Sequence, residues 1–458
     1  MDRKRKLLVT VLTVLGLCSI YEVCYHIFSS DYEYKIEDNA AVITYYKGSE
    51  QNVTLPATLG GAPVIEIGSS AFYKNQSIRT VTIPDSVTVI GDGAFMDSAL
   101  TSVDLPDNLL KIWGWAFSNC VNLQAIRIPA KVSFIGEPFV NGCSQLKSIE
   151  VSGQNTDYVT LDGVLYTSDM ETLLAYPAGK SPEECKIPAG VTRIAEYAFQ
   201  DSAITSVSIP EGVEGIYGYF FHGCKMLRRI DLPASLTAIV DCFDAMGSCD
   251  RLECINVSPD NQVYASLDGM LYVKDMTKLL LYPRGRKESS FTVPNGVHSI
   301  EKQAFFGNES LTEVILPDGA ESIGDFSFAS CEKLERTVLP NSLKSIGNGA
   351  FMTCMNLNSI VLPGSLTTLG RDAFSLCQSL KEITIPRGIT SIGASAFFFC
   401  EGLVSIEIPP TVTSIDANAF LQCPALVISG EAGSYAQTFA RDNNIPFTIT
   451  AGELPAGT

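Results

Sequence analysis

The sequence predicts a β-rich solenoid, between all-β and α/β in class, of about thirteen coils of 22–23 residues with two β-hairpin insertions. Three observations predict it: a phenylalanine, usually preceded by alanine, recurs at near-constant spacing; two strand-like stretches lie between recurrences; and proline or glycine ends those stretches. From Phe305 onward every step is 23 residues. The recurring phenylalanines are Phe72, Phe95, Phe117, Phe139, Phe199, Phe221, Phe243, Phe305, Phe328, Phe351, Phe374, Phe397 and Phe420.

Each repeat reads V-T-x-I-G-x-x-A-F-x-x-C-x-x-L-x-x-I-x-I-P, as in Ile389–Pro409. Its L-x-x-I-x-I and V-T-x-I segments alternate apolar and polar residues with the period of a strand. Proline and glycine mark corners, and we expect the A-F-x-x-C stretch to form a helical turn. In a single coil, burial of the apolar side chains cannot offset the loss of backbone entropy on folding. Stacking buries both faces of each coil, so we expect parallel strands about 4.8 Å apart.

Two interruptions of the repeat predict β-hairpins within residues 152–187 and 258–293. Each contains an Asp-Gly turn, Asp162-Gly163 or Asp268-Gly269, between alternating runs. The units before each interruption also match, and Phe95 and Phe199 are 104 residues apart. We infer a tandem duplication of three units plus a hairpin.

The two ends of the chain differ from the repeats. A helix is expected over Tyr435–Asp442, capped by Ser434, with a returning strand over residues 445–450. The predicted organisation is a signal peptide or anchor (1–30), an N-terminal β cap (31–63), the solenoid (64–428), a C-terminal helix-strand cap (429–450) and a tail (451–458).

The amino terminus has the pattern of an export signal. Four basic residues within Arg3–Lys6 precede an uncharged run from Leu7 to Ile20. A longer run to Phe28, interrupted by Glu22 and His26, is adequate for a retained anchor, and cleavage and retention both stay open. The rest of the chain is therefore expected outside the membrane, secreted or at the cell surface.

Composition excludes several classes of protein. The 50 acidic and 32 basic residues give a net charge of −18, which disfavours nucleic acid as a partner. A hydrophobic content of 46% with 18% charged residues excludes a disordered acidic chain. The three histidines, His26, His222 and His298, form no recognisable catalytic or zinc-binding pattern. We therefore expect no enzymatic activity, no metal and no cofactor.

Seven cysteines each lie three residues after a repeat phenylalanine, which predicts a small buried residue at a tight corner. Paired Cys-x-x-Cys ligand spacing is absent, and side chains stacked in a ladder point in parallel, which is poor geometry for a disulfide. The off-pattern Cys242, Cys249 and Cys254 remain candidates for pairing. The seven are Cys120, Cys224, Cys331, Cys354, Cys377, Cys400 and Cys423.

The outward residue in the middle of the I-x-I segment is apolar in three successive coils: Ile315, Val338 and Val361. One interpretation is a binding stripe for a protein ligand, because exposed apolar patches often mark interfaces. On this hypothesis the stripe is flanked by Glu313, Arg336 and Ser359. The alternative is that β-branched residues simply suit strands.

A second candidate is aromatic. Trp113 and Trp115 in one copy of the duplication correspond to Tyr217 and Tyr219 in the other, where neighbouring coils have glycine. These rings are suited either to stacking on sugars or to packing beneath the adjacent hairpin insertions.

The repeat resembles the bacterial BspA-like leucine-rich repeat family over roughly residues 40–450. The pattern that carries the resemblance is Ile392-Gly393, Ala396-Phe397, Cys400, Leu403, Ile406 and Ile408-Pro409, with the Asp-Gly-Val-Leu-Tyr insert and the Gly-Ser-Tyr-Ala ending. It implies a right-handed leucine-rich repeat superhelix that is exported and, in some members, adheres to host matrix proteins or other cells. The expected function is thus adhesin-like binding of a protein ligand; carbohydrate binding and a purely structural surface role are the alternatives.

Overall fold

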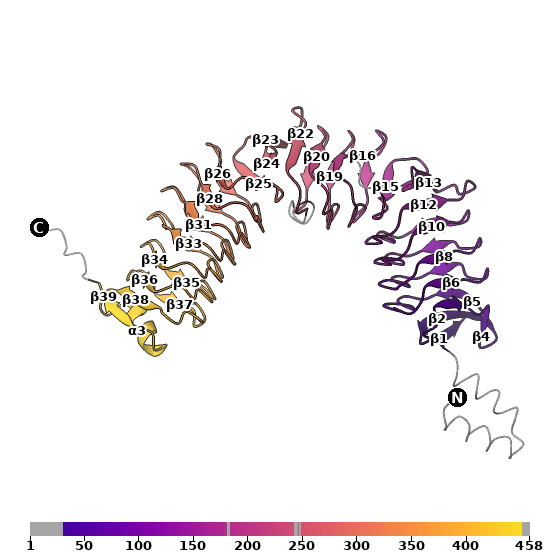
Figure 1. The fold of residues 1–458 in the computed structure, drawn as a ribbon, viewed down its shortest axis with the longest axis horizontal. Helices are drawn as coiled ribbons and strands as arrows, with labels where there is room; N and C mark the ends of the chain where they lie inside the picture. The colour runs from indigo at the N-terminus through magenta and orange to yellow at the C-terminus, as the bar shows by residue number, and fades with distance from the viewer. Residues whose placement is uncertain (1–30, 181–183, 242–245, 247–248, 451–458) are drawn as a thin grey trace, which may run out of the picture. The chain divides into compact units, whose positions relative to one another are not determined.

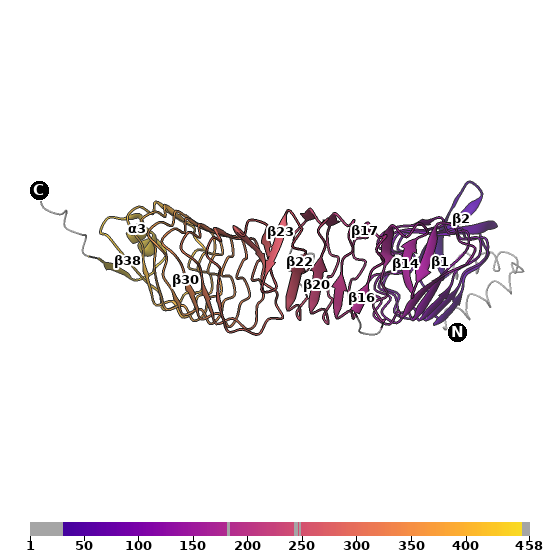
Figure 2. The same ribbon diagram turned by 90° about the horizontal axis from the view of Figure 1, so that it is seen from above.

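A computed structural model describes residues 31–180, 184–241, 246 and 249–450. The expected signal or anchor (1–30), the tail (451–458), Cys242 and Phe243 lie outside the described residues. Contacts divide the chain into two compact units, residues 1–169 with 173–180 and residues 170–172 with 181–458. In each unit the short strands of successive coils lie side by side, which confirms the β-solenoid (Figure 1, Figure 2).

The first unit begins with antiparallel pairs and continues as parallel ladders. The antiparallel pairs are β1 (Tyr32–Glu37) with β2 (Ala40–Tyr46), and β4 (Thr58–Leu59) with β5 (Ala62–Ile67). The strands of the V-T-x-I segments continue from β5 as β7 (Val89–Ile90), β9 (Lys111–Ile112) and β11 (Phe134–Ile135). Those of the I-x-I segments are β3 (Asn52–Thr54), β6 (Thr80–Thr82) and β8 (Ser102–Asp104), then β10 (Ala125–Ile128) with β12 (Ser148–Val151).

The second unit repeats both ladders. Its V-T-x-I strands are β17 (Arg193–Ile194), β19 (Gly215–Ile216), β21 (Ala238–Ile239), β27 (Ser299–Ile300), β29 (Ser322–Ile323), β31 (Ser345–Ile346), β33 (Thr368–Leu369), β35 (Ser391–Ile392) and β37 (Ser414–Ile415). Its I-x-I strands are β16 (Glu184–Lys186), β18 (Ser206–Ser208), β20 (Arg229–Leu232), β22 (Cys254–Val257), β26 (Ser290–Thr292), β28 (Glu313–Ile315), β30 (Arg336–Val338), β32 (Ser359–Ile360), β34 (Glu382–Thr384), β36 (Ser405–Glu407) and β38 (Val427–Gly430), with β39 (Phe447–Ile449) added to β38.

Both predicted hairpins are present. Strands β13 (Tyr158–Leu161) and β14 (Val164–Thr167) pair antiparallel around Asp162-Gly163, and β23 (Tyr264–Leu267) and β24 (Met270–Val273) around Asp268-Gly269. In both turns the aspartate and glycine have positive φ, the conformation of the two-residue hairpin turn that fits strand twist. A third strand follows each hairpin, β15 (Thr172–Ala175) or β25 (Lys278–Leu281).

Within each run of successive coils, the repeat phenylalanine of one coil stacks on that of the next, and the rings are buried. Phe351 lies between Phe328 and Phe374, with ring centroids 5.1 and 5.4 Å apart and ring planes within 2° of parallel. All three residues are fully buried. Aromatic residues from outside the repeat extend the stack at its ends, Tyr46 of β2 against Phe72 and Phe439 against Phe420.

The expected helical turn around each phenylalanine is wrong. The segment is a succession of tight turns in which Phe326 and Ser330, two residues either side of Phe328, have positive φ. These left-handed residues reverse the backbone locally, so alternate amides point along the stack. The Phe328 N–H donates to the Ala350 carbonyl of the next coil at 2.8 Å, whereas the Cys331 N–H donates back to Phe328 within its own coil.

The repeat cysteines form a second ladder beside the phenylalanines. The thiol of Cys354 donates to the Phe328 carbonyl of the preceding coil at 3.1 Å, and Cys377 does the same to Phe351 at 3.2 Å. Cys143 and Cys249 fill the same role although their spacing departs from the pattern. Cys249 and Cys254 are free thiols, so they do not form the pairing for which the sequence left them as candidates.

The helix predicted near the C-terminus is confirmed as α3 (Tyr435–Asp442). The Ser434 hydroxyl accepts from the Gln437 N–H at the helix start, and Asn443 ends the helix. Phe439 and Ala440 are buried, while Tyr435 is exposed. In the described part of the chain, no helix combines the length and apolar character needed to cross a membrane.

Replacing Phe351 by alanine is expected to lower the free energy of unfolding by about 3–5 kcal/mol, because it leaves a cavity between two stacked rings. Urea denaturation followed by circular dichroism measures this. Phe134→Ala, at a partly exposed aromatic residue, is the control and should cost less than about 1 kcal/mol. Equal losses of unfolding free energy in the two variants would show that a ring in the buried stack stabilises the fold no more than a partly exposed ring does.

Replacing Thr337 by valine is expected to raise the free energy of unfolding by about 1–2 kcal/mol. Thr337 is buried, its hydroxyl has no hydrogen-bond partner among the described residues, and its register neighbours are Val314 and Ile360. Thr82→Val, on an exposed strand position, should change the stability by no more than about 0.5 kcal/mol. A lower urea midpoint for Thr337→Val would contradict this reading of the hydroxyl.

Stability is expected to fall as pH rises above about 8.5, the pKa of an unfolded thiol. Burial raises the pKa of Cys331 to about 12, so above pH 8.5 the unfolded chain loses a proton that the folded chain keeps. That thiol should contribute a decline of about 1.4 kcal/mol per pH unit between these pKa values. Urea titrations from pH 8 to 10 should show a shallower decline for Cys331→Ala; parallel curves would refute the assignment.

Candidate functional site

The three apolar residues predicted to form a stripe are brought together in the second unit. Strands β28, β30 and β32 are adjacent and parallel, and Ile315 lies in register with Val338. Val361 follows β32 directly and occupies the same repeat position. Ile315 and Val338 are half-buried, whereas 78% of Val361 is exposed, more than for any other large apolar side chain in the described ranges.

The high exposure of Val361 coincides with a break in both ladders. The sheet containing β28 and β30 ends at β32, and β34 begins the next sheet; the second ladder breaks at the same coil, after β33. The phenylalanine side stays connected there, because the Phe374 N–H donates to Ala396 at 2.8 Å and the Phe374 and Phe397 rings stack at 5.5 Å. The coil of Val361 is therefore joined to the preceding coil through both ladders and to the following coil through its phenylalanine side.

The predicted flanking residues lie two positions before the apolar residues along the chain, on the same face of the sheet. Glu313, Arg336 and Ser359 are in register with one another. The Arg336 and Glu313 side chains form an ion pair with Nη1 and Oε1 3.5 Å apart. Because Arg336 is largely exposed, water screens this pair, and its contribution to stability is small.

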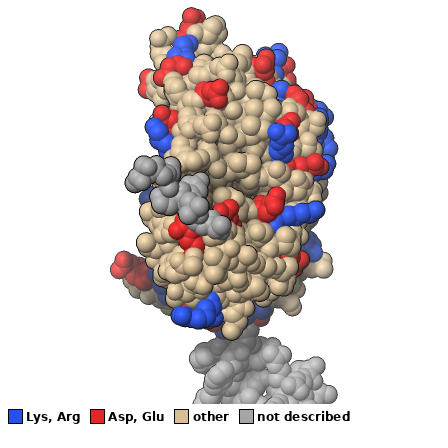
Figure 3. All heavy atoms as spheres, turned by 90° about the vertical axis from the view of Figure 1, so that its left-hand side faces the viewer, with Lys and Arg blue, Asp and Glu red and all other residues tan. Residues whose placement is uncertain are grey.

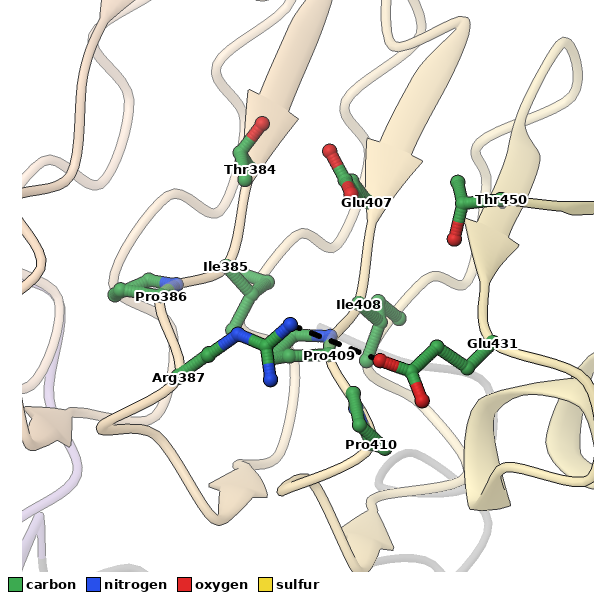
Figure 4. Close-up of a pocket in the computed structure, with 10 residues that line it drawn as sticks. All are labelled: Thr384, Ile385, Pro386, Arg387, Glu407, Ile408, Pro409, Pro410, Glu431 and Thr450. Atoms are coloured by element: carbon green, nitrogen blue, oxygen red, sulfur yellow. Dashed lines mark ion pairs between the residues drawn. The ribbon is translucent and has the colours of Figure 1, made fainter. Parts of the chain in front are cut away.

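Beyond Val361 the same column becomes polar and borders a pocket of about 300 Å³. Figure 4 shows Thr384, Glu407 and Thr450 in a row along one side of it. Thr384 and Glu407 lie on the adjacent strands β34 and β36, and Thr450 directly follows β39 at the end of the same sheet. Thr384 and Glu407 are in register on β34 and β36. Across the pocket, Arg387 reaches Glu431 with Nη2 and Oε1 3.7 Å apart (Figure 4).

The pocket offers hydrogen-bond acceptors on an acidic background. Glu407 is exposed, and among the described residues no ion pair to it is formed. The Arg387–Glu431 pair is long and exposed, so it constrains the pocket weakly. Such a pocket suits a side chain that carries hydrogen-bond donors or positive charge.

Sequence reasoning missed this pocket because two of its lining residues, Glu431 and Thr450, come from beyond the repeat. Thr450 belongs to the segment after α3, where β39 adds to β38. The only signal for it was the strand expected over residues 445–450. A second hollow, of about 280 Å³, lies where α3 meets the last coil; its lining includes Phe420, Leu421, Cys423 and Phe439.

The four aromatic residues singled out by the sequence differ in their exposure. Trp113 and Tyr217 are 44% and 55% exposed, whereas Trp115 and Tyr219 are half-buried. Two of the rings contact rings of neighbouring coils: Tyr219 stacks on Tyr197 at 5.1 Å, and Trp113 packs on Phe134 at 5.0 Å. Tyr219 also meets His222 of its own coil edge-on at 5.6 Å.

Charged side chains form neither a metal centre nor a field of one sign on the face shown in Figure 3. Acidic and basic residues are interspersed there around broad uncharged surface. Within the described ranges, no group of three or more His, Cys, Asp and Glu side chains is placed to hold a metal ion.

Comparison with known proteins gives matches of fold and repeat type. A family model described as BspA type leucine rich repeat region matches residues 45–164, 178–266 and 285–387, in six copies. A leucine rich cell surface protein from Faecalibacterium prausnitzii A2-165 is 30% identical with a TM-score of 0.48, covering 89% of this chain and 95% of that one.

Two further solved structures are similar at lower identity. The pneumococcal vaccine antigen PcpA is 20% identical with a TM-score of 0.48, over 92% of this chain and 98% of that chain. A leucine-rich repeat protein from Bacteroides ovatus ATCC 8483 is 22% identical with a TM-score of 0.42, over 92% and 99%. A search of curated proteins gives no significant match.

Proposed function

The chain belongs to the BspA type leucine-rich repeat family, and from this premise we propose that it is an exported surface protein that binds a protein ligand. The binding surface is the C-terminal sheet face, defined as the column Ile315, Val338, Val361, Thr384 and Glu407 together with the pocket beyond it. The occupant is an extended segment of a matrix or cell-surface protein. The chemistry is non-covalent.

The observation that carries the proposal is the exposure of Val361 in a column that leads into a pocket. An aliphatic side chain with 78% of its surface in water gains most from being covered by a partner. Ile315 and Val338 lie beside it and are half-buried, so their exposed parts extend the apolar surface. The polar end then orients the ligand, as polar groups at the rim of an interface do.

Charge favours a segment with basic residues. The chain has a net charge of −18, which attracts positively charged partners at long range. Glu382 and Glu407 are exposed on neighbouring strands of this face, and no ion pair to either is formed among the described residues. A lysine or arginine of the ligand in the pocket would supply the missing partner.

The test replaces Ile315, Val338 and Val361 together by serine in the full chain. Binding to immobilised collagen, laminin and fibronectin is measured by surface plasmon resonance. Each lost aliphatic contact removes up to about 1.5 kcal/mol, so affinity for a bound member of this panel should fall at least about tenfold.

The matched control changes the same column in the first unit, Thr82→Ser, Asp104→Ser and Arg127→Ser, and should leave binding unchanged. Circular dichroism establishes that both variants fold. Full affinity in the apolar variant, or an equal loss in the control, would show that the C-terminal sheet face does not bind the ligand.

A further inference from the structure

We propose that Trp113 and Tyr217, at equivalent positions of the tandem copies, are each the stacking platform of a binding site for a neutral glycan. The two residues are 104 apart, the same spacing that relates Phe95 to Phe199. Each platform lies next to a V-T-x-I strand, β9 or β19, and is independent of the C-terminal sheet face.

The coils beside Trp113 have glycine at its position in the repeat. The residue after the inward isoleucine is glycine in the coils on both sides of Trp113, Gly91 and Gly136. The reason is a close approach: a Cβ on Gly91 would lie 2.6 Å from the backbone nitrogen of Ser69 in the preceding coil. In the second copy the flanking coils carry Ala195 and Val240, and Tyr217 is the aromatic residue between them; both Trp113 and Tyr217 are exposed and add nothing to the buried core. A ligand accounts for aromatic residues at these exposed positions.

Tyr217 lies flat on its strand. A Cβ on Gly215 would collide with Cε2, Cζ and Oη of the Tyr217 ring, so the ring covers the bare backbone of that glycine. With 55% of the residue exposed, the opposite face of the ring is open to solvent. A flat ring backed by protein is the surface on which the C–H face of a sugar stacks, because both are planar and weakly polar.

Trp113 builds a larger platform of the same kind. Its ring packs against Phe134 of the next coil, with centroids 5.0 Å apart and planes at 57°. Trp113 is 44% and Phe134 38% exposed, so the two rings together form a bent apolar surface that remains open. A polysaccharide, which presents successive sugar faces at different angles, fits such a surface.

A carboxylate lies against the glycine that follows each aromatic residue. The residue after each aromatic is glycine, and the space left by its missing side chain is occupied from the preceding coil. Asp92 Oδ1 lies 3.3 Å from where a Cβ on Gly114 would be, and Glu196 Oε1 lies 2.5 Å from the same point on Gly218.

An aromatic face with an adjacent carboxylate matches the chemistry of a sugar. The ring covers the C–H face while the carboxylate oxygens accept hydrogen bonds from hydroxyl groups. Both Asp92 and Glu196 are exposed, and no ion pair to either is formed among the described residues. Because these groups and the net charge of −18 repel anions, the glycan is neutral.

Tryptophan fluorescence tests the first platform directly, because Trp113 and Trp115 are the only tryptophans in the sequence. The full chain is titrated with maltohexaose, cellohexaose, mannohexaose and chitohexaose, and with sialyllactose as the anionic comparison. We expect a saturable change in emission with at least one neutral oligosaccharide and none with sialyllactose. Isothermal titration calorimetry with the same sugars gives the affinity. No binding of any neutral oligosaccharide by either measurement would overturn the proposal.

The variants Trp113→Gly and Tyr217→Ala introduce residues that a neighbouring coil carries at the same position, Gly91 and Ala195, so they should fold, as circular dichroism will show. Calorimetry should give about one bound oligosaccharide per chain for Trp113→Gly in place of about two for the wild type, and no measurable binding for the double variant. Tyr73→Ala removes an exposed aromatic residue elsewhere and should leave the affinity unchanged.

Undiminished affinity in the double variant would overturn the proposal. A second outcome would also overturn it: the wild type binds no sugar, and Trp113→Gly loses binding to collagen, laminin or fibronectin. Exposed tryptophan and tyrosine also serve as hot spots of protein interfaces, and this outcome would assign Trp113 to that role. The serine substitutions at the C-terminal sheet face should not alter sugar affinity, so the two binding surfaces are tested separately.

Discussion

Stacking of one phenylalanine per coil on the next is the interaction on which the rest of the structure depends. Each ring, such as Phe351, completes its burial only between two neighbours, and its backbone amide is satisfied by the following coil. A single coil therefore has neither a closed core nor a complete set of hydrogen bonds. The cysteine thiols strengthen the same contact, because each donates to the carbonyl of the phenylalanine in the preceding coil.

Stacking converts a repeat position into a column on the surface. Residues 23 positions apart in the sequence, such as Ile315 and Val338, become neighbours about 4.8 Å apart. A surface property can thus be built by changing one position in successive coils while the buried positions stay constant. Val361 and Trp113 are both departures at outward positions, and both are tolerated because the core beneath them is unchanged.

Local pattern was sufficient wherever a residue's environment is set within its own coil. Alternation predicted the strands, Asp-Gly predicted the hairpins, and Ser434 with Phe439 predicted α3. The pattern was insufficient for the turns around the phenylalanines. There a helical turn would satisfy the amides within the coil, but left-handed residues such as Ser330 direct them to the next coil instead.

The amino-acid sequence by itself determined the repeat length, the buried residues of each coil and the columns that face outward, because these follow from a short period that every copy restates. Only the tertiary structure decided how much of each column is exposed. Val361 is more exposed than Val338 at a coil where both ladders break, and Glu431 and Thr450 from beyond the repeat complete the lining of the pocket at Glu407. Such properties depend on the register of neighbouring coils and on the elements that end the stack, which no single repeat encodes.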